Sequence, residues 1–278
     1  MQHPKTILIT GGNTGIGLAT ATQLALAGHT VILACRNQDK ANQAATQIKR
    51  KKADADVRVY ALDLASFDSI KQFAAQVTAD FPVIDVLINN AGAYPVKQQF
   101  TEEGFELQFG VNYLGHYLLT QLLLPAITKA DEARIIHVSS IMHNLGKIDF
   151  DTFRGRAKYS GTAAYGQSKL ANALFSSALA KRLPAHVTSN AVHPGGVDSD
   201  IYREFPSLVH KIFQLFLIST DRAGAYLVNM AVGDEWKGRT GEFKSAHGPL
   251  PISKRAKDNA MIERLYAESA KLAGVNAL

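Results

Sequence analysis

Short β-branched or leucine-rich runs alternate with longer segments of helical periodicity along almost the whole chain. Six strand-like runs lie at residues 6–10, 30–35, 57–61, 86–89, 134–139 and 188–193. Each is followed by a helix-period segment or by a turn that leads into one. Strands that are continuously apolar are buried on both faces, and this β-α repetition produces a parallel sheet with right-handed crossovers. The pattern predicts an α/β fold, a doubly wound Rossmann-type sheet.

The rest of the chain completes this sheet and leaves no room for a separate substrate domain. A weaker seventh strand is expected near residues 241–244, and a polar helix from about 253 to 272. No linker, internal repeat or low-complexity segment interrupts the pattern. We expect a single domain over residues 1–278, with about seven mostly parallel strands. Its dinucleotide-binding half is expected at about 5–140 and its catalytic and substrate half at about 140–278.

Composition and charge limit the partners of such a domain. Of the 278 residues 46% are hydrophobic, and 30 Lys and Arg against 24 Asp and Glu give a net charge of +6. The basic residues are mostly dispersed, which favours a phosphorylated ligand over nucleic acid or a membrane surface. No run approaches the roughly 18 to 20 apolar residues that cross a bilayer, so we expect a cytoplasmic protein without a membrane span. The only cysteine, Cys35, lies in an apolar run and is expected to be a buried, inert thiol.

The turn after the first strand has the sequence T-G-G-N-T-G-I-G. Glycines there let the backbone bend tightly and approach a pyrophosphate, whose charge then faces the N-terminus of the following helix. The spacing differs from the commoner G-x-G-x-x-G, but the strand before the turn and the helix after it are the context that such a site requires. The turn predicts dinucleotide binding by Gly11, Asn13, Thr14, Gly15, Ile16 and Gly17.

The end of the second strand indicates which nicotinamide cofactor is bound. An acidic residue there binds the adenosine ribose hydroxyl, whereas a basic one accommodates a 2′-phosphate. This chain has A-C-R-N there, with Arg36 and Asn37 and no acid at the strand end, and Lys40 lies nearby. We therefore expect NADP(H), with the Arg36 guanidinium on the phosphate. Asp63, after the third strand, is suited to capping, to hydrogen-bonding the adenine, or to both.

Three side chains suited to carbonyl chemistry follow. Tyr165 and Lys169 lie one helical turn apart in Y-G-Q-S-K, and Ser140 ends the fifth strand-like run. Reduction of a carbonyl needs an acid at hydrogen-bond distance from the oxygen. A free phenol ionises near pH ~10, and a cation one turn away favours the phenolate. We expect Tyr165 to be the acid/base, Lys169 to activate it, and Ser140 to donate to the substrate oxygen.

With these features the chain resembles the short-chain dehydrogenase/reductase family. The motifs that carry the resemblance are, in chain order, T-G-G-N-T-G-I-G, D-L at Asp63, N-N-A-G at Asn89, V-N at Val111, V-S-S at Val138, Y-G-Q-S-K and H-P-G-G-V. The resemblance spans residues 5–274 and implies a Rossmann-type oxidoreductase. In the short sequence stretches around these motifs, the chain is most similar to the retinol dehydrogenases and related NADP-dependent reductases.

The resemblance also implies roles for single residues. It implies a catalytic set of Asn112, Ser140, Tyr165 and Lys169, in which Lys169 also binds the nicotinamide ribose. Asn112 is expected to hold a water that relays protons to Lys169, or else to be a helix-interior Asn with a backbone partner. The further implied cofactor contacts are Asp63, Leu64, Asn90, Ala91, Gly92, Pro194, Gly195, Val197 and Ser199. The family more often has Thr where Ser199 stands, but the hydroxyl is retained.

The histidines do not indicate a metal site. His116, His137 and His193 lie in or beside motif segments, but none is paired with a Cys or a carboxylate at metal-ligand spacing. We expect His137 to be a core histidine with its hydrogen bonds satisfied. His143, which follows Ser140, either contacts substrate or is structural.

The substrate side and the assembly remain open at this stage. Residues 198–220 are rich in large apolar side chains, which form either a lid over an apolar substrate or a packing or dimer contact. Tyr94 and Tyr202 either line the pocket or are exposed loop residues. Helices near 103–124 and 165–183 are suited to pairing in a homodimer, which the long segment before Tyr165 would equally obstruct.

Together these features predict an NADP(H)-dependent oxidoreductase. Its substrate is expected to be a small lipophilic carbonyl or alcohol, such as an aldehyde, a ketone or a retinal-like compound. The alternative is an NADPH-binding redox sensor or regulator without turnover. A sensor needs the glycine turn and Arg36, but it does not need Asn112, Ser140, Tyr165 and Lys169 together.

Overall fold

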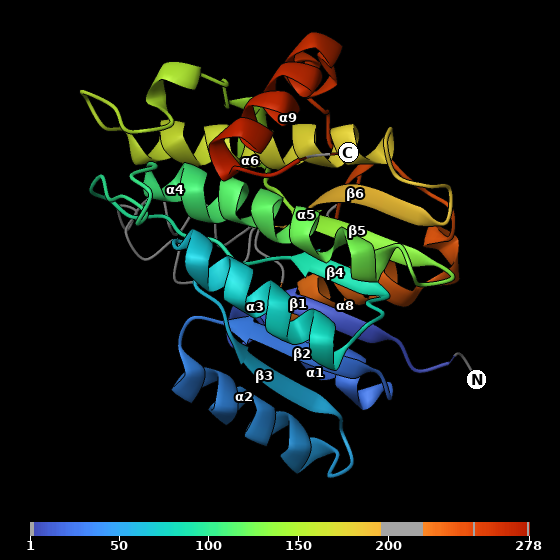
Figure 1. Ribbon diagram of the computed structural model, residues 1–278. Coiled ribbons are helices and arrows are strands. Elements are labelled where there is room, and N and C mark those ends of the chain that lie inside the picture. Colours follow the sequence, from blue (N-terminus) through green and yellow to red (C-terminus); the bar gives the residue numbers. More distant parts are fainter. Residues whose placement is uncertain (1–2, 196–218, 247, 277) are drawn as a thin grey trace.

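A seven-stranded parallel sheet forms the centre of the computed structural model, which describes residues 3–195, 219–246, 248–276 and 278 (Figure 1). The strand order is β3-β2-β1-β4-β5-β6-β7, and each neighbouring pair is parallel. The strands are β1 (Thr6–Thr10), β2 (Thr30–Cys35), β3 (Val57–Ala61), β4 (Val86–Asn89), β5 (Ala133–Val138), β6 (Val187–His193) and β7 (Phe243–Ser245). The predicted doubly wound α/β fold is confirmed, and the sheet expected to be mostly parallel is parallel in all of these strands.

Strand boundaries follow the apolar runs closely. The first four strands begin and end at the predicted residues, while β5 and β6 each begin one residue earlier. The shift arises because Ala133 and Val187 are themselves buried and pair with each other across the sheet. The short β7 lies nearer the C-terminus than expected, after Gly241, whose φ of 74° ends the preceding turn.

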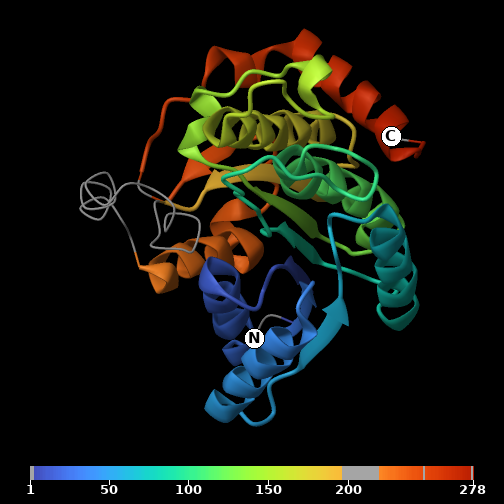
Figure 2. The same cartoon turned by 90° about the vertical axis from the view of Figure 1, so that its left-hand side faces the viewer.

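Helices cover both faces of the sheet. They are α1 (Gly15–Leu26), α2 (Gln38–Lys51), α3 (Phe67–Asp80), α4 (Leu107–Phe109), α5 (Gly115–Ile127), α6 (Gly161–Ala180), α8 (Thr220–Val232) and α9 (Asn259–Ala273). Side chains alternate between the faces along β1: Ile7 and Ile9 pack with α1, α2 and α8, whereas Leu8 packs with α3, α5 and α6. Figures 1 and 2 show the sheet between these two helical layers.

The strand order reverses beside β1, which lies between β2 and β4. The connections that follow β1 and β4 pack on opposite faces of the sheet. Open α/β sheets bind their ligands at such a point, outside the carboxyl ends of the strands. The expected site residues follow the carboxyl ends of β1 to β6. The fold therefore brings segments far apart in sequence to one edge of the sheet.

Five of the longer helices begin with a side-chain cap. The capping residues are Asn37 for α2, Ser66 for α3, Ser160 for α6, Ser219 for α8 and Asp258 for α9. Each side-chain oxygen accepts a backbone N–H of the first turn, which satisfies one of the donors that a helix start leaves unpaired. Helix α1 differs, because its N-cap residue Thr14 makes no such bond.

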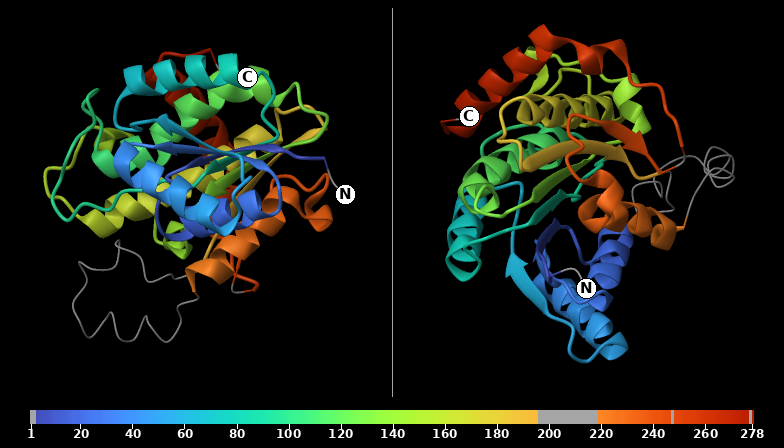
Figure 3. Two further views of the ribbon diagram at one scale, coloured as in Figure 1. Left: turned by 90° about the horizontal axis from the view of Figure 1, so that it is seen from below. Right: turned by 90° about the vertical axis from the view of Figure 1, so that its right-hand side faces the viewer.

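The C-terminal helix α9 lies across α5 and α6. The hydroxyl of Tyr117 donates to the carbonyl of Tyr266, and Gln121 donates to the Tyr266 hydroxyl. Just after α6, the Arg182 guanidinium lies 4.2 Å over the Tyr266 ring. The right-hand view of Figure 3 shows α9, in red, on the outside of α6. Helix α9 thus covers part of the face on which a homodimer was expected, and that homodimer stays a prediction.

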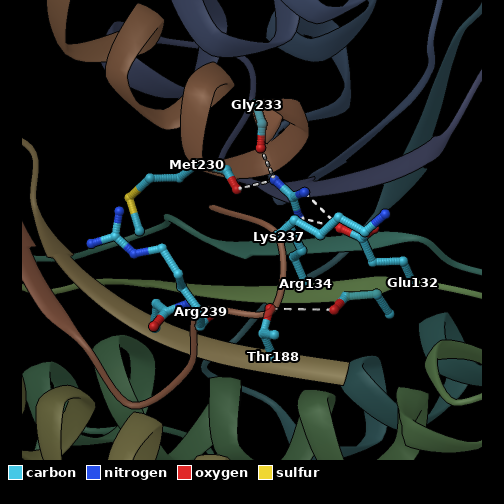
Figure 4. A network of polar contacts seen from close by, with 9 residues as sticks. Glu132, Arg134, Thr188, Met230, Gly233, Lys237 and Arg239 are labelled. Atoms are coloured by element: carbon cyan, nitrogen blue, oxygen red, sulfur yellow. Dashed lines mark hydrogen bonds and ion pairs between the residues drawn. The ribbon is translucent and has the colours of Figure 1, made fainter. Parts of the chain in front are cut away.

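Arg134 of β5 binds the C-terminal end of α8 and holds it on the sheet (Figure 4). Its side chain is 5% exposed and donates to the carbonyls of Met230 (3.1 Å) and Gly233 (2.8 Å). It also pairs with Glu132, with Nη2 2.6 Å from Oε1. A cation at a helix C-terminus satisfies its last carbonyls and opposes the negative end of the helix dipole.

We expect Arg134→Met to lower the free energy of unfolding by about 2 to 3 kcal/mol, because the two buried carbonyls lose a charged donor. Lys237→Met is the matched control, since Lys237 is 74% exposed and lies 3.9 Å from the same Glu132. The control should stay within about 1 kcal/mol of the parent protein. Urea denaturation of the three proteins measures both effects. Equal losses in both variants would show that Arg134 acts only as a surface charge.

Candidate active site

The glycine turn between β1 and α1 has the backbone geometry that its sequence predicts. Gly11 and Gly15 have φ values of 65° and 54°, in the left-handed region that favours glycine. Gly17 has a different role, since a Cβ there would lie 2.4 Å from the carbonyl oxygen of Gly11. This turn folds back on the first turn of α1. Ile16 is half-buried, and its neighbours Thr14 and Gly15 are exposed.

The start of α1 is suited to an anion. No side chain caps the helix, and its first turn has no acidic residue. The N–H groups at this end are therefore available to a ligand, and the helix dipole favours negative charge there. Asn13 is half-buried beside these groups. The turn fits the pyrophosphate of a dinucleotide.

Arg36 and Lys40 lie exposed after β2, beside the same edge. Asn37 has a structural task, because its Oδ1 accepts the backbone N–H of Lys40 at 2.9 Å and caps α2. Asp63 closes the turn before α3, since its Oδ1 accepts the N–H of Ala65 at 2.9 Å. The cap of α3 itself is Ser66, and the adenine contact of Asp63 stays a prediction. The side chain of Leu64 is buried.

The loop after β4 packs directly on the glycine turn. The hydroxyl of Thr10 accepts the backbone N–H groups of Asn90 (2.9 Å) and Ala91 (3.0 Å). In return Nδ2 of Asn90 donates to the carbonyl of Thr10 at 2.9 Å. Gly92 comes next, and a Cβ there would lie 3.8 Å from Nζ of Lys169. Loop and turn together bring the cofactor residues expected from the N-N-A-G motif beside the expected catalytic lysine.

Helix α6 is joined to the end of β5 by buried hydrogen bonds. Nζ of Lys169 donates to the carbonyl of Val138 at 2.9 Å, and Oγ of Ser139 donates to the carbonyl of Lys169 at 2.7 Å. Nδ2 of Asn172 also reaches the Val138 carbonyl, at 3.3 Å. Lys169 is 3% exposed, and this burial lowers the pKa of its ammonium to about 8.

Tyr165 is half-buried one turn before Lys169, with the Lys169 Nζ 5.5 Å from the centre of its ring. The ring of Tyr94 meets the Tyr165 ring edge-on, with centroids 5.2 Å apart. Ser140 caps the short 3-10 helix η2 (Ile141–Asn144), and its Oγ accepts the N–H of Met142 at 3.2 Å. The Ser140 hydroxyl hydrogen is therefore left to donate to a substrate.

Close packing of two glycines brings the Ser140 segment against α6. A Cβ on Gly146 would lie 2.2 Å from the carbonyl oxygen of Gly166, the residue after Tyr165. A Cβ on Gly166 would lie 3.2 Å from the carbonyl oxygen of Met142. The structure thus brings the segment that carries Ser140 beside the helix turn that carries Tyr165.

Asn112 lies in a π-helical turn, η1 (Gly110–Leu114), immediately before α5. π-helical turns are rare and are frequent at functional sites. The Asn112 side chain has a backbone partner, as the structural alternative expected: Oδ1 accepts the N–H of Ala93 (2.6 Å) and Nδ2 donates to its carbonyl (3.0 Å). Nδ2 also reaches the Ser168 hydroxyl at 3.1 Å. The side chain therefore holds the loop after β4, and the water relay stays a prediction.

Pro194 and Gly195 follow β6, and Gly195 has a φ of 100°. Val197 and Ser199, expected on the nicotinamide, lie outside the described residues. The same holds for Tyr202 and for nearly all of the expected lid at 198–220.

The histidines of this region are internal. His137 is fully buried, which lowers its pKa to about 3, and its Nδ1 lies 3.3 Å from Nδ2 of Asn89. The expected core position is confirmed, but among the described residues its Nε2 has no hydrogen-bond partner, so only one ring nitrogen is satisfied there. His143 is buried as well, with Nδ1 2.7 Å from the carbonyl of Ser140 and its ring against Phe243. Of the two roles expected for His143, these contacts favour the structural one over contact with substrate. No group of three potential metal ligands occurs within the described part of the chain.

Cys35 is buried as expected, and burial raises the pKa of its thiol to about 11. Sequence reasoning missed Thr10 and Ser168, which link the site segments. Thr10 carries a usable signal, because it is a polar residue at the end of an apolar strand directly before the glycine turn. Ser168 carries none, since a serine inside a helix is common.

Comparison with known proteins defines the class to which this fold and site belong. The family model described as short chain dehydrogenase matches residues 5–207, and the chain belongs to this family. It is therefore an oxidoreductase that acts on CH–OH or C=O groups, and the family uses NAD(P). The predicted family is confirmed.

Among its relatives the chain is similar to retinol dehydrogenases. It is 41% identical to human retinol dehydrogenase 13, over 98% of this chain and 86% of the relative. It is 40% identical to retinol dehydrogenase 12 of Mus musculus, over 98% and 87%. A solved uncharacterized protein from Mycobacterium paratuberculosis superposes with a TM-score of 0.79 at 35% identity, over 98% of this chain and 94% of that one. A Shigella flexneri short chain dehydrogenase complexed with NADP has a TM-score of 0.72 at 25% identity, over 87% and 97%.

The lowered pKa of Lys169 makes the free energy of unfolding depend on pH. Below pH 8 the folded protein buries a charged ammonium, and between pH 8 and 10.5 the folded state has released this proton while the unfolded state keeps it. The destabilisation is therefore full below pH 8 and is lost as the pH rises to 10.5. We expect Lys169→Met to raise the free energy of unfolding at neutral pH by on the order of 2 to 3 kcal/mol, with the gain shrinking through this window.

Denaturant titrations across this pH range measure the difference between variant and parent protein. Lys271→Met is the control for loss of an exposed lysine, since Lys271 is 75% exposed on α9. A difference for Lys169→Met that stays constant from pH 8 to 10.5 would contradict the lowered pKa.

Proposed function

We propose that the protein reduces a lipophilic aldehyde or ketone, or oxidises the corresponding alcohol, with NADP(H). The observation that carries this proposal is the position of Lys169. Its buried ammonium lies next to the Tyr165 ring and beside Gly92, on the same edge of the sheet as the glycine turn. That position supports a phenol that both gives and takes a proton where a dinucleotide reaches the sheet edge.

The protein groups have separate tasks in reduction. The glycine turn and Arg36 would hold NADPH, which when bound would supply a hydride for the carbonyl carbon. The Tyr165 hydroxyl gives its proton to the carbonyl oxygen, and the Lys169 cation stabilises the phenolate that remains. The Ser140 hydroxyl donates to the same oxygen, where negative charge develops. In the oxidation of an alcohol the Tyr165 phenolate takes the hydroxyl proton instead.

The preference for NADP(H) is supported by Arg36. Its guanidinium is exposed after β2, and it has no hydrogen bond or ion pair to the other described residues, so it is available to a 2′-phosphate. No carboxylate occupies the strand end, where one would bind a free ribose hydroxyl. The Shigella flexneri relative was solved with NADP, which agrees with this choice.

A lipophilic substrate is supported by apolar side chains on the loops around Tyr165. Val96, Ile141 and Leu145 are 60%, 42% and 71% exposed. Val96 follows Tyr94, whose ring contacts Tyr165, and the other two follow Ser140. Exposed apolar side chains gathered near a site are typical of a surface that receives an apolar ligand. The relatives named as retinol dehydrogenases make polyene carbonyls a suitable first test.

No helix among the described residues is long and apolar enough to span a membrane. A cytoplasmic location stays a prediction.

We expect Tyr165→Phe to lower kcat by about 100-fold or more, since the proton donor is removed, while the NADPH dissociation constant stays within about threefold. NADPH oxidation with aliphatic, aromatic and polyene carbonyls measures turnover, and cofactor fluorescence measures binding. Tyr94→Phe is the matched control, because it keeps the ring beside Tyr165 and removes only the hydroxyl near Thr162. Full turnover by Tyr165→Phe would contradict the proposed mechanism.

Arg36→Ala tests the cofactor choice. Loss of a charge-assisted contact to the 2′-phosphate should raise the NADPH dissociation constant by roughly 10- to 100-fold and leave that of NADH within about threefold. Arg50→Ala, on the exposed last turn of α2, removes the same charge away from the candidate site. Equal weakening of both cofactors by Arg36→Ala would speak against a phosphate contact.

A further inference from the structure

His116 is buried between the glycine turn and Asn112, and neither its sequence position nor the proposed mechanism gives it a task. The side chain is 1% exposed near the start of α5. Its Nδ1 lies 3.1 Å from the backbone carbonyl oxygen of Asn112, and its Nε2 lies 2.8 Å from Oγ1 of Thr10. One imidazole ring therefore spans two segments of the site.

The chemistry of the partners determines which ring nitrogen carries the proton. A carbonyl only accepts, so Nδ1 must donate to Asn112. Burial lowers the pKa of His116 to about 4, with the charge of Lys169 acting in the same direction, so the ring is neutral and Nε2 accepts. The Thr10 hydroxyl already accepts two backbone N–H groups, from Asn90 and Ala91. Its own hydrogen has two acceptors in reach, and Nε2 of His116 at 2.8 Å is much closer than the carbonyl of Ile88 at 3.4 Å.

The bonds therefore run in one direction. Backbone N–H groups of the loop after β4 donate to Thr10, Thr10 donates to His116, and His116 donates to Asn112. At one end this chain holds the loop against the glycine turn, where Nδ2 of Asn90 also reaches the carbonyl of Gly11 at 3.3 Å. At the other end it holds the π-helical turn whose Asn112 side chain binds Ala93.

We propose that His116 is a positioning residue that couples the dinucleotide turn to the π-helical turn of Asn112 through its neutral tautomer with the proton on Nδ1. The coupling rests on the proposed function, because it concerns the alignment of the cofactor side with the proton-transfer side. His116 touches neither reacting atoms nor cofactor. Its two hydrogen bonds fix the distance between the end of β1 and the turn before α5.

The tautomer can be measured without any substrate. In protein labelled with 15N-histidine, His116 should show a protonated Nδ1 and an unprotonated Nε2. The protein has nine histidines, and the spectrum of His116→Gln assigns the signal. A proton on Nε2 would overturn the proposal, because the bond to the Asn112 carbonyl would then be absent.

Two substitutions separate the two bonds. The amide nitrogen of an Asn side chain falls near the position of Nδ1. His116→Asn therefore keeps the hydrogen bond to the Asn112 carbonyl and loses the one to Thr10. The amide of a Gln side chain falls near the position of Nε2. His116→Gln therefore keeps the hydrogen bond to Thr10 and loses the one to the Asn112 carbonyl. We expect His116→Asn to raise the NADPH dissociation constant roughly three- to tenfold with kcat within about threefold. We expect His116→Gln to lower kcat roughly three- to tenfold with NADPH binding within about threefold.

His186→Gln is the control, since His186 is an exposed histidine at the opposite end of the sheet, before β6. The control should change neither quantity. A merely structural role would lower thermal stability and shift both quantities together in both His116 variants, and that result would overturn the coupling. Absence of turnover by the parent protein on every carbonyl would overturn the proposed function alone, because the tautomer and the NADPH dissociation constants still decide the role of His116.

Discussion

The sheet is covered by helices on both faces, and this constraint decides where the polar chemistry of the molecule lies. Between the two layers the strands carry apolar side chains on each face, and a polar group there is costly unless it is paired. Their carboxyl ends are the places where backbone N–H groups, hydroxyls and charges meet. The glycine turn, Arg36, Ser140 and the loop of Asn90 each follow one of these ends. The place of the candidate site, beside β1, is thus a consequence of strand order.

The site depends on buried polar groups that are tied to one another. Lys169 is held by the Val138 carbonyl, and Ser139 returns a bond to the Lys169 backbone. These bonds fix where Tyr165 stands relative to the end of β5. They also place an ammonium where water is excluded, which burial alone disfavours. The chemistry that we propose for Tyr165 would give this unfavourable charge a function.

Most of the fold and much of the site are readable from the sequence, because both depend on local patterns. Continuous apolar runs located the strands, and the glycine turn located the start of α1 within a residue. The sequence did not show what Asn112 binds, because a partner such as Ala93 is reached only through the fold. The same reason hid the bond between Thr10 and His116, whose residues are 106 positions apart. That Nε2 of His137 has no partner within the described part of the chain likewise depends on packing that no residue pattern records.

The position of α9 has a consequence for how the chain matures. The hydroxyl groups of Tyr113 and Ser269 are bonded although they lie 156 positions apart, and Tyr117 is joined to Tyr266 across 149 positions. A chain folds from its N-terminus during synthesis, so α5 and α6 are made well before the helix that covers them. Until that last helix leaves the ribosome, the aromatic face of α5 stays open to water and to other chains. Nascent protein truncated before α9 is for this reason the form most exposed to aggregation.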